Sequence, residues 1–188
     1  MKRLVSLLLL VGCSKAPSPW EKVGVRVVDG KPQLGEVEIE LGRTTCEGVC
    51  PEYTVKLCGD GRLIYTGKTF VKTTGEHEAT FDPEKLLPLL QRLAELDFLS
   101  DKHACSIGGI DNDHAWVTLR IGARSSTVWD AVTGTLDLLI PVIPNISTDE
   151  VLWHRKMIEL ENAIDALSGS DFWVGTQAER AAHGSEWR

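Results

Sequence analysis

The sequence predicts an α+β fold: an antiparallel β-sheet, built as a meander of hairpins, with two helices packed on one face. Several short segments alternate apolar and polar residues with a period of two and are separated by turn residues, which is typical of half-buried strands. Two longer segments repeat apolar residues at three- and four-residue spacing, which is typical of amphipathic helices. Strands and helices that do not alternate regularly favour the α+β class.

The expected strands are joined at turns, several of them rich in glycine. Val37, Ile39 and Leu41 share one face of a strand over residues 36–41, with polar residues on the other face. The Gly-Asp-Gly turn at 59–61 is typical of a hairpin. The expected strand segments are 23–28, 36–41, 53–58, 63–65, 69–72, 77–81, 116–121 and 126–129. Turns are expected at 29–30, 59–61, 73–75 and 122–123.

Asp82 and Pro83 mark the start of the first helix, as its N-cap and its first helical residue. Pro88 lies inside the helical pattern and predicts a kink or a weak first turn. A second helix is expected over about 149–167 and ends at Gly169. The apolar stripe of the first helix consists of Leu86, Leu89, Leu90, Leu93 and Leu96.

The first twelve residues predict an export signal that is removed from the chain. Lys2 and Arg3 form a basic head, and the apolar run over 4–11 is far too short to cross a hydrocarbon core of about 30 Å. The run ends in Leu-Val-Gly-Cys, which resembles the lipobox of bacterial lipoprotein signals. That resemblance implies cleavage before Cys13 and lipid, including palmitate, on its thiol. The alternative is an ordinary secretory signal in which Cys13 has no role.

Cleavage leaves a single domain between a short spacer and a tail. Removing 12 of the 188 residues leaves 176, which is enough for one hydrophobic core. We expect the lipidated cysteine and an extended Pro/Ser spacer over 13–22, and the domain over 23–167. Residues 131–148 are expected to be irregular, and 168–188 form the C-terminal tail.

The charge of the cleaved chain excludes some partners. Loss of Lys2 and Arg3 leaves 18 basic and 27 acidic residues, a net charge of −9. Nucleic acid requires clustered basic residues, so it is not expected as a partner. We expect membrane attachment through the lipid anchor alone, and an envelope protein or glycan as partner. Ser14, in place of Asp, favours the outer membrane facing the periplasm.

Four cysteines remain after Cys13, an even number that suggests disulfides in an exported chain. Cys58 ends a strand that begins beside Cys46 and Cys50, so roughly 17 Å of strand separates it from them. A disulfide requires a Cα separation of about 4.4–6.8 Å. The sequence therefore predicts a local Cys46–Cys50 pair and a long-range Cys58–Cys105 pair.

The segment around the first two of these cysteines resembles a known bacterial family. Cys-Glu-Gly-Val-Cys-Pro-Glu-Tyr at 46–53, the Gly-Asp-Gly turn and Tyr-Thr-Gly at 65–67 resemble the family DUF6438. The resemblance covers roughly residues 36–167, with 131–148 as an insertion. It implies exported proteins, often lipoproteins, and no assigned activity.

Two catalytic alternatives depend on particular side chains. Cys46 and Cys50 could act as a thiol–disulfide oxidoreductase pair, but their three-residue spacing and the following strand favour a structural role. Asp111, Asp113 and His114 could hold a metal ion for a metal-dependent enzyme. A polar loop before a strand explains the same residues, because the glycine and glutamate of an EF-hand loop are missing.

The leading hypothesis is therefore a membrane-anchored envelope lipoprotein with a non-catalytic binding or structural domain. No catalytic set of residues is convincing, and no cofactor is expected. Trp116 and Trp129 lie on expected partner strands, where they either pack across the strands or form an exposed aromatic platform.

Overall fold

The computed structural model describes residues 16–46, 48–100, 114–130, 147–183 and 186–187. The strands are β1 (Val27–Val28), β2 (Lys31–Pro32), β3 (Val37–Arg43), β4 (Glu52–Cys58), β5 (Arg62–Thr69), β6 (Gly75–Thr80), β7 (Ala115–Ile121) and β8 (Arg124–Asp130). The helices are α1 (Pro19–Lys22), η1 (Pro83–Lys85, a 3₁₀ turn), α2 (Leu86–Glu95), α4 (Thr148–Ser168), α5 (Ser170–Val174) and α6 (Gln177–His183).

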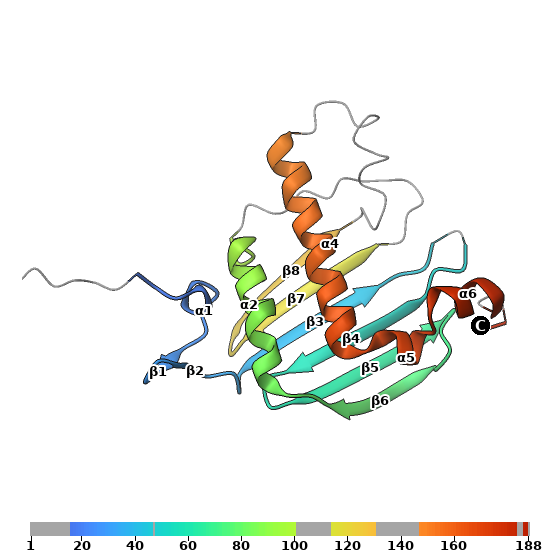
Figure 1. Cartoon of the computed structure of the whole chain (residues 1–188), viewed down its shortest axis with the longest axis horizontal. Helices are drawn as coiled ribbons and strands as arrows, with labels where there is room; N and C mark the ends of the chain where they lie inside the picture. Colours follow the sequence, from blue (N-terminus) through green and yellow to red (C-terminus); the bar gives the residue numbers. More distant parts are fainter. Residues whose placement is uncertain (1–15, 47, 101–113, 131–146, 184–185, 188) are drawn as a thin grey trace, which may run out of the picture.

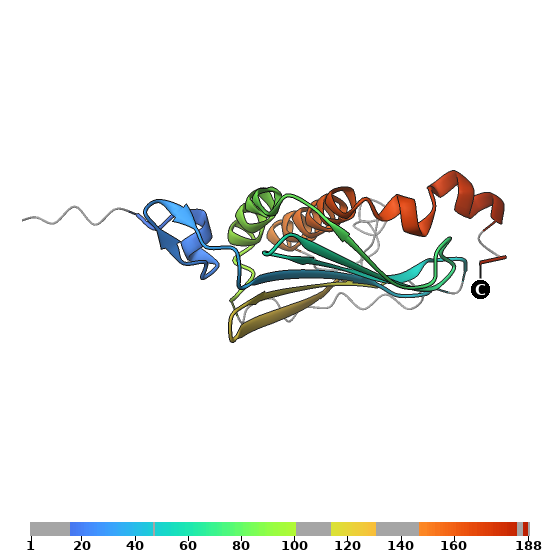
Figure 2. The same cartoon turned by 90° about the horizontal axis from the view of Figure 1, so that it is seen from below.

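The α+β architecture expected from the sequence is confirmed. Six strands form one antiparallel sheet in the order β6-β5-β4-β3-β7-β8. Helices α2 and α4 lie side by side on one face of that sheet (Figures 1 and 2). No helix within the described ranges is long and apolar enough to cross a membrane.

The strand order departs from a simple meander at one place. Strands β3 to β6 follow one another across the sheet, but β7 pairs with β3 and not with β6. Along the chain, the edge strand β6 is followed by helix α2 and then by β7. In the sheet, β7 lies on the side of β3 away from β4 (Figure 1). As a result β3 becomes a central strand, and its inward side chains meet both halves of the sheet.

Alternate residues of the sheet and one stripe of each helix form the core between the two layers. Burial of each aliphatic side chain contributes about 1.5–3 kcal/mol to folding. The buried side chains include Val37, Ile39, Leu41, Val55, Leu57, Leu63, Tyr65, Leu86, Leu90, Leu93, Val117, Leu119, Met157, Leu160 and Ile164. The leucine stripe expected on the first helix faces this core.

The two expected helices begin and end as their sequences indicate. Asp82 accepts a hydrogen bond from the Glu84 amide, and the first turn is 3₁₀ before α2 becomes regular. Pro88 explains the weak first turn, because its nitrogen carries no hydrogen for the helical bond. Helix α4 starts at a Ser147–Glu150 capping box and ends at Gly169, whose φ of 63° is left-handed.

Several expected elements at the edges of the domain are wrong in extent. Residues 69–72 are not a separate strand, because β5 continues to Thr69 and the chain leaves the sheet at Phe70, where φ is 53°. Of the strand expected at 23–28, only the last two residues pair, while Val23 and Val25 enter the core. The spacer expected to be extended ends in helix α1, which Ser18 caps.

The C-terminal tail, for which no helices were expected, folds into α5 and α6. It is held against the β5–β6 connection by main-chain hydrogen bonds. Lys72 N donates to Val174 O and Thr73 N donates to Trp173 O. The Trp173 ring also stacks on Tyr65, with ring centroids 5.4 Å apart.

The loop between β3 and β4 contains the expected local disulfide. Cys46 and Cys50 are joined, with their Cα atoms 5.5 Å apart. Cys58 is a buried free thiol within the described part of the chain. Cys105 lies outside the described residues, so the Cys58–Cys105 pair stays a prediction.

Replacing both Cys46 and Cys50 by serine should lower the free energy of unfolding by about 2 kcal/mol, because the bridge closes a five-residue loop. Urea unfolding of the wild-type chain and of the double variant measures the loss. Adding reductant to the variant tests for the second pair. A further loss of about 4 kcal/mol in the free energy of unfolding would reveal a Cys58–Cys105 bridge. Equal stability of the oxidised wild type and the variant would contradict the expected role of the local bridge.

Candidate functional site

A cleft of about 710 Å³ opens at the end of the sheet where β3 ends and β4 begins. Helix α4 forms one wall, and α5 and α6 form the other. Its lining is mostly polar. The lining residues are Arg43, Pro51, Tyr53, Ile158, Glu161, Asn162, Asp165, Ala166, Gly169, Ser170, Asp171, Val174, Gln177 and Arg180.

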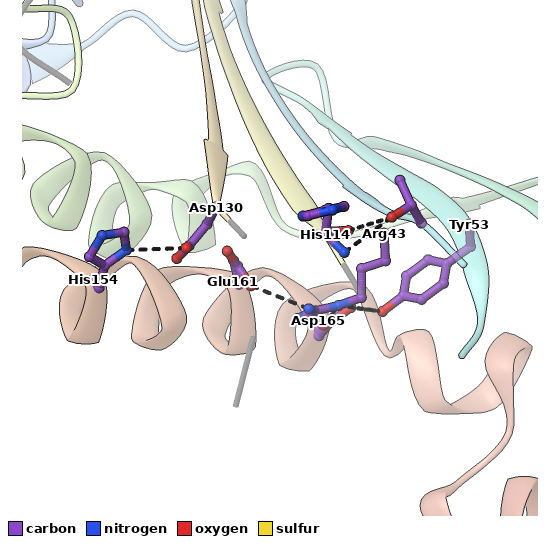
Figure 3. Close-up of polar contacts among 8 residues, drawn as sticks. Arg43, Tyr53, His114, Asp130, His154, Glu161 and Asp165 are labelled. Atoms are coloured by element: carbon purple, nitrogen blue, oxygen red, sulfur yellow. Dashed lines mark hydrogen bonds and ion pairs between the residues drawn. The ribbon is translucent and has the colours of Figure 1, made fainter. Parts of the chain in front are cut away.

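A row of aligned residues crosses four strands at this end of the sheet. The register places Tyr53 of β4 opposite Arg43 of β3, Arg43 opposite Ala115 of β7, and Ala115 opposite Asp130 of β8. The row continues the inward face that carries the apolar core, so its polar side chains face helix α4 (Figure 3). Three of the four residues are polar, whereas most of the other side chains on this face are apolar.

Arg43 joins the sheet to helix α4 through two carboxylates. Its Nη2 and Nε donate to Asp165 Oδ2 at 2.8 and 3.1 Å, and its Nη1 donates to Glu161 Oε2 at 3.2 Å. Tyr53 completes the group, since its hydroxyl donates to Asp165 Oδ1 at 2.7 Å and accepts from Arg43 Nε at 3.1 Å (Figure 3). These four side chains, hereafter the Arg43 network, hold one another in fixed orientations.

Burial controls the ionisation of the Arg43 network. It raises the pKa of Glu161 to about 8, with repulsion from Asp130 and Asp165 adding to the shift and Arg43 opposing it. Burial also raises the pKa of Tyr53. For Arg43 burial acts in the opposite direction, but attraction to Asp165, Tyr53 and Glu161 outweighs it and raises the pKa.

The Glu161 carboxyl is the most buried group that lines the cleft, with 1 % of its side chain exposed. Its Oε2 is bound to Arg43, but its Oε1 has no hydrogen-bond partner within the described part of the chain. Leaving a buried carboxyl oxygen without a donor is costly. The Glu161 carboxyl therefore destabilises the fold locally, at the inner end of the cleft.

A second buried polar pair lies two turns earlier on the same helix. His154 Nδ1 is 3.1 Å from Asp130 Oδ1, and both side chains are at most 2 % exposed. Since Asp130 also repels Glu161, the pair lies next to the Arg43 network (Figure 3). Helix α4 thus carries acidic or basic groups at positions 154, 161 and 165 on its sheet-facing side.

The loop between β3 and β4 carries the cysteine motif noted in the sequence, and β5 carries the Tyr-Thr-Gly motif. Residues 37–145 match DUF6438, a domain of unknown function. The chain belongs to the DUF6438 family. The match starts at β3 and ends before helix α4, so it is shorter than the stretch over 36–167 suggested by the resemblance. A search of curated proteins finds no significant match.

The boundary of the DUF6438 match divides the cleft. Arg43, Pro51 and Tyr53 come from the matched region, whereas the remaining lining residues belong to α4 and the two short helices after it. Pro51 follows the second cysteine of the motif and Tyr53 ends it. The disulfide loop therefore lies at the rim of the cleft.

Of the residues predicted as functional sites, those that the structure describes do not line this cleft; they are Cys46, Cys50, Cys58 and His114. Cys13, Cys105, Asp111 and Asp113 lie outside the described residues, as does the region 131–146. His114 is described, and its main chain pairs with Thr44: Thr44 N donates to His114 O at 2.9 Å. No group of three His, Cys, Asp or Glu side chains suited to a metal is found among the described residues. The redox and metal alternatives stay hypotheses.

The cleft residues that sequence reasoning missed follow the same spacing as the core. Arg43 continues the alternation Val37, Ile39, Leu41 by one step, which places it on the inward face. Glu161 follows Met157 and Leu160 within the apolar stripe of the second helix. A charged residue at a core position was the signal that could have identified the site.

Trp116 and Trp129 pair across β7 and β8 on the opposite face of the sheet, with ring centroids 5.0 Å apart. The Trp116 ring covers Gly42, where an added Cβ would lie 1.9 Å from ring atom Cζ2. Trp129 is 53 % exposed. The cross-strand packing expected of this pair is therefore present, and one ring is also accessible.

Replacing Glu161 with glutamine should remove a pH dependence of stability. Between the ordinary pKa of 4.5 and the folded value of about 8, the folded protein retains a proton that the unfolded chain has lost. Wild-type stability should therefore fall as the pH rises through this window and level off above it. Relative to Glu161→Gln, the fall should be on the order of 3–4 kcal/mol.

Urea unfolding at several pH values between 4.5 and 8.5 measures this difference. Glu159→Gln is the matched control, because Glu159 is an exposed carboxylate on the same helix, paired with Arg92 at 3.4 Å. The control should follow the wild-type pH profile. Parallel profiles for the wild type and Glu161→Gln would show that Glu161 does not titrate in this window.

Proposed function

We propose that this protein is a lipid-anchored envelope protein whose DUF6438 domain, together with helices α4 to α6, binds a small polar molecule without catalysing its conversion. The observation that carries the proposal is the cleft itself, a polar cavity whose inner wall is fixed by the Arg43 network. A volume of about 710 Å³ is typical of sites for small molecules.

The Arg43 network supports binding because it is ordered before any ligand arrives. Arg43, Tyr53 and Asp165 hold one another through hydrogen bonds of 2.7 to 3.1 Å across two layers of the fold. A wall that is already ordered reduces the conformational entropy that a ligand must remove on binding. The same network fixes the position of α4 relative to the sheet.

The chemistry of the Arg43 network favours a binding role over a catalytic one. The hydroxyl of Tyr53 has a raised pKa and donates to Asp165, so it is not an activated nucleophile. The Arg43 guanidinium contacts protein groups through Nε, Nη1 and Nη2. The arrangement therefore suits recognition of a ligand by shape and hydrogen bonds.

Anchoring at the envelope is supported by the sequence. The basic head, the short apolar run and the Leu-Val-Gly-Cys ending at Cys13 are typical of a lipoprotein signal. Two or three acyl chains hold a protein stably at a membrane, whereas one chain binds marginally. In this proposal the anchored chain presents its cleft in the periplasm, from the outer membrane.

Replacing Cys13 with alanine should abolish incorporation of radioactive palmitate and leave an uncleaved precursor, because the thiol is the site of lipid attachment. Labelling of cells that express the chain, followed by gel electrophoresis, provides the measurement. A double Cys46→Ala, Cys50→Ala variant is the control and should label normally. Normal labelling of Cys13→Ala would contradict the proposed anchor.

Filling the cleft should prevent ligand binding without unfolding the protein. Ala166 is exposed on the cleft wall, so Ala166→Trp places a bulky ring in the cavity. Ligand-observed NMR with a library of small polar molecules, on the full chain in detergent, identifies binders. Each should weaken by at least about tenfold in Ala166→Trp, a loss of about 1.4 kcal/mol.

Lys156→Trp is the matched control, since Lys156 is exposed on the same helix but does not line the cleft. It should leave binding unchanged. Library members that bind equally to the wild type and Ala166→Trp would show that the cleft is not the binding site. The absence of any binder would count against the proposed function.

A further inference from the structure

Arg180 of helix α6 is a cation of the cleft that has no counterion in the described part of the chain. Its side chain is partly buried and lines the cleft. Its Nη1 donates to the carbonyl oxygen of Gly175, which fixes the guanidinium at the junction of α5 and α6. Within the described ranges no carboxylate forms an ion pair with Arg180. Its Nε and Nη2 therefore remain available as donors.

Glu179, the residue before Arg180, does not neutralise it, because both carboxylate oxygens of Glu179 are engaged. Oε1 accepts a hydrogen bond from Lys72 Nζ at 2.9 Å, and Oε2 accepts one from Thr176 N at 2.8 Å. The Thr176 amide and Lys72 lower the pKa of Glu179 to about 2. The charge of Glu179 is thus used to cap α6 and to tie this helix to the β5–β6 connection.

The carboxyl groups that line the cleft also leave the charge of Arg180 uncompensated. Both Asp165 oxygens accept hydrogen bonds inside the Arg43 network, where Arg43 balances the charge. Glu161 holds a proton at neutral pH, because burial raises the pKa of its carboxyl to about 8. Asp171 is exposed to solvent and forms no ion pair with Arg180. Since removing an unpaired cation from water is unfavourable, Arg180 indicates that an anionic group belongs in the cleft.

Uncharged polar side chains line the cleft together with Arg180. They are the Ser170 hydroxyl, in a residue that is 5 % exposed, and the amide groups of Asn162 and Gln177. None of the three side chains hydrogen-bonds to another residue of the described ranges. Each can donate to a ligand and accept from it without breaking a contact of the fold.

From these observations we infer that the cleft binds a small molecule with a single carboxylate, which the guanidinium of Arg180 holds. Ser170, Asn162 and Gln177 bind the polar remainder of that molecule. The inference deepens the binding function proposed above and depends on it. A guanidinium is a planar fork that matches the two oxygens of a carboxylate. One uncompensated cation, with Asp171 on the same lining, favours a single negative charge over the two of a phosphate group.

Isothermal titration calorimetry of the full chain in detergent at pH 7 tests the inference with matched pairs of probes. Lactate, gluconate and N-acetylglycinate are each compared with the primary amide of the same acid, which keeps the size but removes the charge. We expect at least one of these carboxylates to bind, and to bind at least about tenfold more tightly than its amide. Inorganic phosphate, titrated separately, should bind more weakly than that carboxylate.

Two variants assign the carboxylate to Arg180. Arg180→Gln removes the charge and the fork, so it should weaken carboxylate binding at least about tenfold and leave amide binding unchanged. Arg180→Lys keeps the charge without the fork and should bind the carboxylate with intermediate affinity. Arg26→Gln is the control, because Arg26 is exposed just before β1, at the opposite end of the molecule from α6 (Figure 1). It should behave like the wild type.

Thermal unfolding distinguishes a binding role of Arg180 from a structural one. Without ligand, Arg180→Gln should lower Tm by at most about 4 °C, because it removes one hydrogen bond and no ion pair. The carboxylate that binds should raise the Tm of the wild type but not that of Arg180→Gln. A much larger loss of stability in the ligand-free variant would overturn the inference, since it would show that Arg180 already has its partner in the fold.

The remaining outcomes separate the inference from the proposed function. Equal or tighter binding of the amides or of inorganic phosphate would overturn the carboxylate assignment while leaving the cleft as a binding site. An unchanged carboxylate affinity in Arg180→Gln would also overturn it. If none of the three carboxylates binds, the inference fails, and the library screen with Ala166→Trp decides independently whether the binding function fails with it.

Discussion

The contact between Arg43 and helix α4 is the constraint on which the functional end of the molecule depends. Apolar packing holds α4 on the sheet, but it is much less directional than hydrogen bonding. Hydrogen bonds from one guanidinium to carboxylates at positions 161 and 165 permit a single register. That register places Gly169 where the chain turns, and so positions the short helices that complete the cleft.

The sequence predicts the architecture well because the core follows simple periodicities. Alternation along β3 and the leucine stripe of α2 identify elements that are buried on one side, and the caps at Asp82 and Gly169 mark helix ends. The strand order is harder to predict, since hydrophobic alternation does not say which strand pairs with β3. In the structure the second neighbour of β3 is β7, which is separated from β3 by three other strands and by α2 along the chain.

The candidate site could not be predicted in the same way, because its residues are far apart in sequence and are joined only by the fold. Arg43 and Asp165 are separated by 122 positions, yet they form a 2.8 Å ion pair. Sequence reasoning instead selects residues that cluster locally, such as Asp111, Asp113 and His114. Ionic groups inside an apolar pattern are weaker signals, but here they are the ones that meet.

The packing of Trp116 on Gly42 has a consequence for how members of the family can differ. The ring lies so close to the β3 backbone that even an alanine methyl group has no room at position 42. A larger residue at this position therefore requires a smaller one at 116, and a smaller residue at 116 alone leaves the Gly42 backbone uncovered. We therefore expect positions 42 and 116, which face each other on β3 and β7, to change together among members of the family.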